Sequence, residues 1–467
     1  MRWAKRPFFA VFATLLGYVA VVLLFESIKK IQDKVREEYL KQGDDGVWQK
    51  VVGTKYEFLV FSAYVEDRDI EVQHSFKTQP AVRIVGVGRQ IQGKMAERLY
   101  CRFLYNTDKT SGVNESGSVL GKAALVPIKE NWGLNYTACF IFCSISKNGT
   151  IPSSVSIYSE ASSKRYLETQ DLKDLNDSGN RLSVQNRRAE DRKVTTEINM
   201  AACINPMHSN FSRVWPLIEW LEMNKMLGVS HFYFYNRSMA PNVSCAFNHY
   251  IKKGEVTVLD WRTNLPRFLV RTNVQIRDGN IFAAMNDCLY RGMFKHKYLM
   301  FADFDEFLVP EGKDANLLKF VEKISAKEKK VASFLFKNTF YFLEWPTDPK
   351  YKGLDLITQT KTIRQKGFDP PMSRSKYITK PERVTMVGNH FVWENTNGAW
   401  TWKGLNETEA SSRHYRICEF PPDVCRNPQR GERDARMWDF EKQLSEKMNQ
   451  VQEEIGKKCG LERIKMV

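Results

Sequence analysis

The chain has 467 residues, of which 43% are hydrophobic and 27% charged, and this composition excludes a disordered or low-complexity protein. Its length suggests two or three domains. The net charge of +16 raises the question of nucleic acid, but Lys and Arg are spread along the chain and no RNA- or DNA-binding signature occurs. We therefore expect no nucleic-acid partner, and a basic surface that attracts anionic small molecules.

The amino-terminal segment predicts a membrane anchor. Basic residues precede Phe8–Phe25, an uncharged and mostly apolar run that is just long enough to span a bilayer. A cleaved signal peptide is the alternative, but no small-x-small cleavage site follows this run. We expect residues 1–7 to form a cytosolic tail, residues 8–25 a single transmembrane signal anchor and residues 26–55 a polar stem.

Sequons and cysteines indicate the compartment of everything after residue 25. Eight Asn-x-Ser/Thr sequons occur, more than chance predicts, which argues for a luminal location. Nine cysteines fit an oxidising compartment and leave at least one thiol without an intramolecular partner. Possible pairings are those among Cys101, Cys139 and Cys143, and that of Cys418 with Cys425. The sequons are Asn114, Asn135, Asn148, Asn176, Asn210, Asn236, Asn242 and Asn406.

Residues 56–160 have the pattern of a β-rich accessory domain. Short runs of β-branched and aromatic residues alternate with turn residues, as in a small antiparallel sandwich or barrel. The expected strands are 56–65, 82–87, 98–105, 123–128, 138–146 and 155–158. Residues 161–195 are polar and charged, and they are predicted to form a linker.

From residue 196 the pattern changes to alternating strands and helices. This alternation predicts a mostly parallel sheet that is covered on both faces, over residues 196–420. Residues 421–467 are expected to form a C-terminal helical extension. The expected strands are 197–204, 231–235, 255–261 and the run that ends at residue 303, and the expected helices are 211–227, 248–253 and 281–294.

The strongest chemical signal is the motif Asp303-Phe-Asp305 at the end of an apolar strand. Side chains two residues apart in an extended segment point the same way, so the two carboxylates can converge. Paired carboxylates at the carboxyl end of a buried strand suit Mn²⁺ or Mg²⁺, which can hold a diphosphate and stabilise its charge as it leaves. Asp67-Arg-Asp69 has the same spacing, so spacing alone does not decide the matter.

A phosphotransferase of the haloacid-dehalogenase type is one alternative for this motif. Such enzymes also place Asp-x-Asp after an apolar strand, early in the domain. They usually carry Thr or Val two residues after the second Asp, where this chain has Phe307. At least three expected strands also precede the motif here, which argues against this class.

Several separated motifs keep the order found in a known family. They are Cys203-Ile-Asn-Pro206, Trp220-Leu-Glu222, Asn286-Asp-Cys-Leu-Tyr-Arg291, Asp303-Phe-Asp-Glu-Phe307, Ser375-Lys-Tyr-Ile-Thr-Lys-Pro381, Asn389-His-Phe391 and His414-Tyr-Arg416. With them, residues 197–416 resemble glycosyltransferase family 92. The resemblance implies an inverting, metal-dependent β-galactosyltransferase with the GT-A nucleotide-sugar-binding (Rossmann-like) fold. One departure is Gly279-Asn280, where members often have Gly-Gln.

The resemblance implies the partners, whereas the apolar run and the sequons give the compartment. A UDP-sugar, UDP-galactose in particular, is the expected donor, and a glycan or glycoprotein is the expected acceptor. We expect a single-pass type II Golgi membrane protein with a luminal catalytic domain. A non-catalytic lectin or adhesion protein with an inactive transferase domain is the other alternative, and the presence of both Asp residues and of two late His residues argues against it.

Roles for the metal and donor residues follow from the resemblance. Asp303 and Asp305 are expected to bind Mn²⁺ (or Mg²⁺) and, through it, the diphosphate. His414 is expected to be the third ligand, with His390 as its rival. Glu306 is expected to bind the donor sugar or to brace the strand end, and Arg416 to contact phosphate.

The acceptor side of the site is less well defined by the sequence. Inversion requires a carboxylate base near the acceptor hydroxyl, and Asp369 in Gly-Phe-Asp-Pro-Pro is our choice for it. Other carboxylates in the same region are Glu344, Glu382 and Glu394. Aromatic rings at Trp393, Trp400 and Trp402 are expected either to stack on acceptor sugars or to pack in the core.

Overall fold

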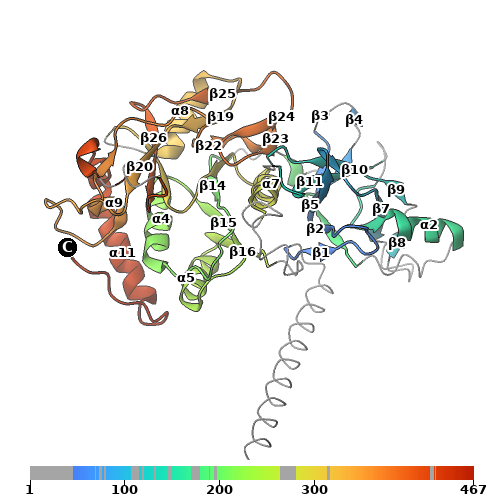
Figure 1. The fold of residues 1–467 in the computed structure, drawn as a ribbon, viewed down its shortest axis with the longest axis horizontal. Helices are drawn as coiled ribbons and strands as arrows, with labels where there is room; N and C mark the ends of the chain where they lie inside the picture. Colours follow the sequence, from blue (N-terminus) through green and yellow to red (C-terminus); the bar gives the residue numbers. More distant parts are fainter. Residues whose placement is uncertain are drawn as a thin grey trace, which may run out of the picture.

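The computed structural model describes residues 46–467 apart from short gaps, and it groups them into two units (Figure 1). The predicted tail and anchor and most of the predicted stem lie outside the described residues. No helix in the described part of the chain is long and apolar enough to cross a membrane. The residues left out of the description are 1–45, 69, 73–75, 78–79, 107–114, 118–119, 131–132, 146–149, 170–178, 189, 194–196, 263–279, 313–315, 421–424 and 426.

The first unit is an eleven-stranded sheet that curls into a nearly closed, barrel-like form (Figure 1). Neighbouring strands pair antiparallel except β13 with β2, which are parallel. Helix α2 (Glu160–Thr169) follows β12, and the disulfide Cys101–Cys143 joins β7 to β11. The strands are β1 (Gln49–Lys50), β2 (Leu59–Glu66), β5 (Ala81–Ile91), β6 (Lys94–Met95), β7 (Leu99–Asn106), β8 (Glu115–Gly117), β9 (Gly121–Lys122), β10 (Ala124–Pro127), β11 (Tyr136–Ser144), β12 (Ser154–Ser159) and β13 (Leu182–Gln185).

Part of the segment 161–195, predicted as a linker, belongs to this sheet. Strand β13 fills the position between β2 and β12, and Leu182 and Val184 are buried in the core of the first unit. The sequence does not predict this short strand, because only two apolar side chains alternate in it and the residues around it are polar.

The second unit is built on a seven-stranded sheet with the order β16-β15-β14-β17-β22-β19-β25. Helices α4 (Val214–Met226), α5 (Pro241–Lys252) and α11 (Glu441–Ile455) cover one face, and α7 (Ile281–Gly292) covers the other, next to the first unit (Figure 1). The strands are β14 (Met200–Cys203), β15 (His231–Asn236), β16 (Val256–Asp260), β17 (Tyr298–Phe301), β19 (Val331–Phe336), β22 (Lys376–Thr379) and β25 (Thr401–Gly404).

The predicted fold class, a mostly parallel sheet after a small antiparallel domain and one transmembrane helix, is corrected to a mixed α/β fold with several sheets. Strand β22 runs antiparallel to both β17 and β19, so the seven-stranded sheet is mixed. Periodicity identifies strands but not their partners, which is why the sequence did not reveal these pairings. The smaller sheets are β18 (Glu306–Pro310) with β26 (Ala410–Arg416) and β20 (Asn338–Phe342), β21 (Ile363–Gln365) with β27 (Gly431–Arg433), β23 (Val384–Val387) with β24 (Val392–Asn395), and β3 (Glu71–Val72) with β4 (Phe76–Lys77).

Alternating side chains on the central strands separate two cores. Met200 and Ala202 of β14 pack in the core beneath α4, whereas Ala201 and Cys203 pack in the core that includes α7 and the first unit. Helix α4 buries its apolar stripe in the first of these cores and ends before Gly228, whose φ of 103° favours glycine.

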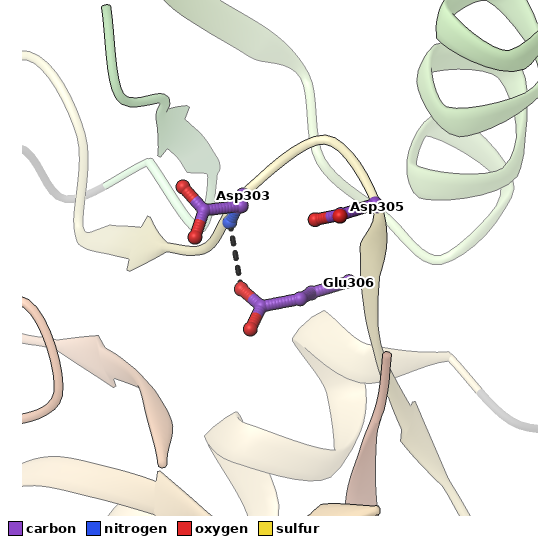
Figure 2. A group of neighbouring side chains, drawn as sticks. All are labelled: Asp303, Asp305 and Glu306. Carbon is purple, nitrogen blue, oxygen red and sulfur yellow. Dashed lines mark hydrogen bonds between the residues drawn. The ribbon is translucent and has the colours of Figure 1, made fainter. Parts of the chain in front are cut away.

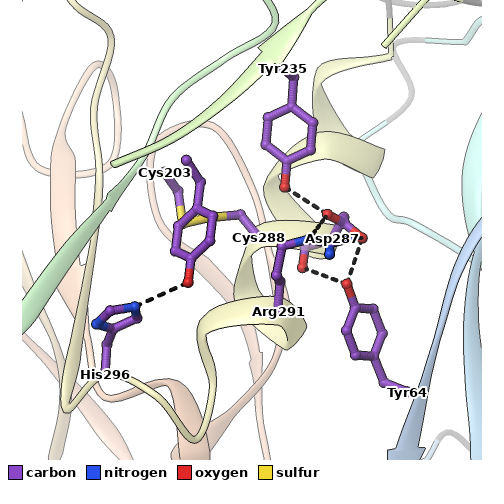
Figure 3. Close-up of a disulfide and its surroundings, with 8 residues drawn as sticks. Tyr64, Cys203, Tyr235, Asp287, Cys288, Arg291 and His296 are labelled. Carbon is purple, nitrogen blue, oxygen red and sulfur yellow. Dashed lines mark hydrogen bonds and ion pairs between the residues drawn. A yellow bond between two sulfur atoms is a disulfide. The ribbon is translucent and has the colours of Figure 1, made fainter. Parts of the chain in front are cut away.

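Helix α7 joins the two units through a buried polar network (Figure 3). All of its residues are buried, and the carboxylate of Asp287 lies at its centre. Asp287 accepts hydrogen bonds from Ser62 at 2.5 Å and Tyr64 at 2.7 Å in the first unit, and from Tyr235 at 2.7 Å in the second. Arg291 balances its charge, with Nε 2.9 Å from Oδ2. The two units therefore share one core.

A disulfide fixes α7 to the central sheet near this network. Cys203 at the end of β14 is bonded to Cys288 of α7 (Figure 3). The carboxyl end of β14, which contributes to the site below, is thus held against the helix that carries the contacts to the first unit.

Candidate functional site

Three carboxylates gather where β17 ends and β18 begins (Figure 2). Oxygen atoms of Asp303, Asp305 and Glu306 lie within 4.8 Å of one another. The side chains of Asp303 and Asp305 are 29% and 27% exposed, whereas that of Glu306 is 2% exposed. The two aspartates therefore face solvent, and Glu306 lies beneath them.

The backbone of the turn holds these carboxylates in place. The amide of Asp303 donates to Oε2 of Glu306 at 2.8 Å, and the amide of Glu306 donates to the carbonyl of Asp303 at 3.0 Å. The indole of Trp220 in α4 donates to the carbonyl of Glu306 at 2.8 Å. These three hydrogen bonds hold the turn in place without a bound ligand.

A buried lysine lies between the carboxylates. Nζ of Lys376 is 2.9 Å from Oδ2 of Asp303 and 3.3 Å from Oε2 of Glu306. Asn205 donates to the other oxygen of Asp303 at 2.6 Å. The amide oxygen of Asn389 lies 3.3 Å from Nζ of Lys376 and 3.4 Å from Nδ2 of Asn205, so one side chain touches both partners of Asp303.

The pKa values of the Asp303 and Glu306 carboxyl groups shift in opposite directions. Burial raises the pKa of Asp303, but attraction to the Lys376 ammonium outweighs burial and holds the pKa below its usual value. Burial raises the pKa of Glu306, and the neighbouring Lys376 and His414 only partly offset it. Asp303 is therefore the more readily ionised of the two.

His414 of β26, the predicted third ligand, contacts two of these carboxylates. Its Nε2 lies 3.4 Å from Oδ2 of Asp305, and its Nδ1 lies 3.1 Å from Oε1 of Glu306 without hydrogen-bond geometry. Burial lowers the pKa of His414, but the carboxylates of Glu306 and Asp305 outweigh it and raise the pKa above its usual value.

His390, the rival ligand, contacts Asn389 and the backbone of Ser375. Its Nδ1 is 3.3 Å from the carbonyl of Ser375, and its Nε2 is 3.3 Å from Nδ2 of Asn389. Burial and the Lys376 charge lower the pKa of His390 to about 4. Its contacts are with Asn389 and Ser375, whereas His414 touches the carboxylates themselves.

The contacts of Glu306 and Arg416 bear on the substrate-binding roles predicted for them. Glu306 is engaged by Lys376, His414 and the turn backbone, an arrangement that favours bracing over sugar contact. Arg416 pairs with Glu419 and donates to the carbonyl of Ile417 at 3.3 Å. Among the described residues, Arg416 makes no hydrogen bond or ion pair with Asp303, Asp305 or Glu306.

The four carboxylates considered for the base lie in different surroundings. Asp369 accepts a hydrogen bond from Asn338 at 3.0 Å and lies 3.9 Å from Arg374. Glu344 accepts from the amide of Cys418 at 2.9 Å. Glu382 lies 3.3 Å from Arg383, and Glu394 lies 2.9 Å from Lys129 of the first unit. None of the four joins the described cluster at Asp303.

The three tryptophans considered for acceptor binding also lie in different surroundings. Trp393 is half-buried against Phe391, with ring centroids 4.6 Å apart. Trp400 lies under Arg383, whose guanidinium carbon is 4.0 Å from the ring centroid. Trp402 on the edge strand β25 is 48% exposed, and it is therefore the freest of the three to contact a sugar.

Three residues of the site, Lys376, Asn205 and Asn389, were given no role from the sequence. Asn205 follows β14 by two residues, and parallel strands end at the same edge of a sheet. The position of Asn205 near Asp303 could therefore have been predicted from the sequence. Lys376 begins an antiparallel strand, and the pairing of Phe301 with Tyr377 puts it beside the end of β17. That pairing could not be read from the sequence.

The carboxylates fit a hard divalent cation. Asp303 and Asp305 offer exposed oxygen ligands, and each carboxylate oxygen of Asp303 keeps a lone pair beyond its present hydrogen bond. Nε2 of His414 lies 3.4 Å from Oδ2 of Asp305 and would add a nitrogen ligand. Glu306, at Nδ1 of the same ring, would orient that histidine.

Comparisons with known proteins agree with a transferase of this kind. The family model described as Glycosyltransferase family 92 matches residues 198–458, more than half of the chain, and the chain therefore belongs to this family. A Caenorhabditis elegans protein named Beta-1,4-galactosyltransferase galt-1 is 25% identical over 140 residues, which are 29% of this chain and 32% of that protein. The match thus spans about a third of the length of this relative.

One solved structure resembles the chain only weakly. It is titled Crystal structure of S. aureus TarS 1-349, and the likeness covers 56% of this chain and 74% of that one at 11% identity. Its TM-score of 0.27 is too low to support any argument about the fold.

Proposed function

We propose that this protein transfers galactose from UDP-galactose to a glycan acceptor with inversion, in a reaction that depends on Mn²⁺ or Mg²⁺. The observation that carries the proposal is the pair of solvent-facing aspartates at the end of β17, within a family 92 domain. The name of the nematode relative supports galactose as the sugar. The acceptor is given only as a class, a glycan or glycoprotein.

In this proposal the residues of the site have separate tasks. Asp303, Asp305 and Nε2 of His414 would hold the cation, which would supply positive charge to stabilise the leaving diphosphate. Lys376 keeps Asp303 ionised and adds a second positive charge close to the same point. Glu306 holds Lys376 and His414 from below.

The acceptor hydroxyl requires a base on the opposite side of the sugar from the leaving group. Asp369 is the residue we propose for this role, and Arg416 remains the proposed phosphate contact. The intact aspartate pair is the reason to prefer a transferase over the lectin alternative.

We also propose that the protein acts in the lumen of the secretory pathway, and the Golgi is the compartment that we expect. Four disulfides in the described residues support an oxidising compartment. Cys139 is the ninth cysteine; it is buried and free, and burial raises the pKa of its thiol. Two disulfides not yet named are Cys245–Cys459 and Cys418–Cys425.

A transfer assay tests the proposal. The full chain is incubated on a glycan array with UDP-galactose, UDP-glucose or UDP-N-acetylglucosamine, with Mn²⁺ and then with a chelator. Transfer from UDP-galactose above the other donors, lost in chelator and restored by Mn²⁺, is the expected result. Preferred use of another donor refutes the sugar, and full transfer in chelator refutes the metal.

A further inference from the structure

The hairpin β23–β24 approaches the carboxylate site from the side of the first unit. Its turn carries Asn389, whose amide oxygen lies 3.3 Å from Nζ of Lys376 and 3.4 Å from Nδ2 of Asn205. Both of those groups hold Asp303, at 2.9 Å and 2.6 Å. The position of the hairpin turn therefore bears directly on the surroundings of Asp303.

The first unit and α7 hold the base of this hairpin. Arg68 in the segment after β2 donates to the carbonyl of Val384 at 2.9 Å, and Arg83 of β5 donates to that of Thr385 at 3.1 Å. Asn286 of α7 exchanges two hydrogen bonds with the backbone of Val387, at 2.9 and 3.0 Å. These contacts explain how the hairpin is docked, but they stop short of the turn.

One side chain of the first unit reaches the turn itself. Glu130, in the loop after β10, accepts hydrogen bonds through Oε2 from the amide of Asn389 and from the indole of Trp393, each at 3.2 Å. Gly388 makes this approach possible, because a Cβ there would lie 2.7 Å from the same oxygen. A carboxylate 259 residues away in sequence thus fixes the backbone of Asn389.

We infer that Glu130 is a positioning residue through which the first unit sets Asn389, and with it the Lys376 and Asn205 contacts to Asp303. The first unit then completes the donor side of the site. The inference rests on the proposed function for the role of Asp303, but the contacts that carry it do not depend on the identity of the donor.

The chain offers a matched control in the neighbouring residue. Lys129 pairs with Glu394 on the second strand of the same hairpin, with Nζ 2.9 Å from Oε1. Lys129→Met removes a contact between the same loop and the same hairpin, but it leaves the turn alone. Glu130→Gln keeps an acceptor oxygen, so it should restore most of what Glu130→Ala loses.

The test uses the full chain and two readouts. Hydrogen exchange is followed in peptides that cover 386–393 and 298–307, and the affinity for Mn²⁺ is measured by calorimetry in the presence of UDP. Glu130→Ala removes both hydrogen bonds, of which the one to the amide of Asn389 bears on the site. We expect faster exchange in both peptides and about fivefold weaker Mn²⁺ binding, the effect of losing that one bond. Lys129→Met and Glu130→Gln should stay close to wild type at residues 298–307.

Each outcome decides the inference. Equal effects of Glu130→Ala and Lys129→Met on both readouts, or unchanged exchange at 298–307, would overturn it. Where Glu130→Ala does not fold, Glu130→Asp withdraws the oxygen while keeping the charge, and it should show the same pattern. If wild type binds no Mn²⁺, the proposed function fails, and the exchange measurement alone decides the role of Glu130.

Discussion

The ammonium group of Lys376 lies 2.9 Å from a carboxylate oxygen of Asp303 and is shielded from solvent, with a side chain that is 3% exposed. Strand β22 brings it there by running antiparallel to β17. The buried ammonium group of Lys376 therefore lies beside the aspartates that we expect to bind a metal ion. Lys376 and that metal ion would both interact with Asp303.

Replacing Lys376 with Met should destabilise the protein and make its stability dependent on metal. The variant leaves the buried Glu306 without its lysine partner, and breaking a buried pair in this way costs about 3 kcal/mol. Added Mn²⁺ should raise the melting temperature of the variant more than that of wild type, because it restores positive charge beside Asp303. Thermal unfolding with and without Mn²⁺ measures this; an equal rise in both proteins would argue against a shared site.

Glu219 should give the free energy of unfolding a pH dependence near neutrality. Its buried carboxyl group accepts bonds from Ile357 and Thr358, yet burial raises its pKa to about 7. The pKa of Glu219 in the folded protein thus lies above the unfolded value of about 4.5. The contribution of Glu219 to the free energy of unfolding is therefore complete below pH 4.5 and is lost as pH rises through 7.

We expect the contribution of Glu219 to fall by about 3 kcal/mol over that range as an upper bound. Denaturant unfolding at several pH values between 4.5 and 8 should show a shallower decline for Glu219→Gln than for wild type. Glu446→Gln, on the exposed face of α11, is the control and should follow wild type. Parallel curves for all three proteins would contradict the assignment.

The shared core predicts that the two units unfold together. Ser62→Ala removes a buried hydrogen bond to the charged Asp287 and should cost about 2 kcal/mol, whereas Ser153→Ala removes a bond to a carbonyl within the first unit and should cost about 1 kcal/mol. Calorimetry should show a single transition in each protein. Two separate transitions in wild type would mean that the interface around α7 does not couple the units.

Exposed sequons should carry glycans if the chain enters the secretory pathway. Asn135, Asn210 and Asn406 are exposed in the described residues, while Asn236 is half-buried with its amide oxygen shielded. Mass spectrometry of tryptic peptides from protein made in animal cells should find glycans at the first three and little at Asn236. Unmodified peptides at all three exposed sites would count against a luminal location.

Local features of this fold were readable from the sequence, but long-range pairings were not. The runs that became β2, β5, β7 and β11, and the helical spacing of α4, follow from period and composition. The pair Asp303 and Asp305 was predictable because strand ends place such residues at one edge of a sheet. The contribution of Lys376 depends on an antiparallel pairing, and that of Glu130 on contact between two units, and neither leaves a local signal.

The most direct test compares two aspartates that belong to Asp-x-Asp motifs, Asp303-Phe-Asp305 and Asp67-Arg-Asp69. Asp305 faces solvent at the end of β17 next to His414, whereas Asp67 pairs with Arg192 at 2.8 Å in the first unit. Galactosyl transfer from UDP-galactose in Mn²⁺ is measured for Asp305→Asn and Asp67→Asn. We expect a loss of about a hundredfold or more for the first, since the metal contributes several kcal/mol, and nearly full activity for the second. Wild-type activity in Asp305→Asn would contradict the central claim.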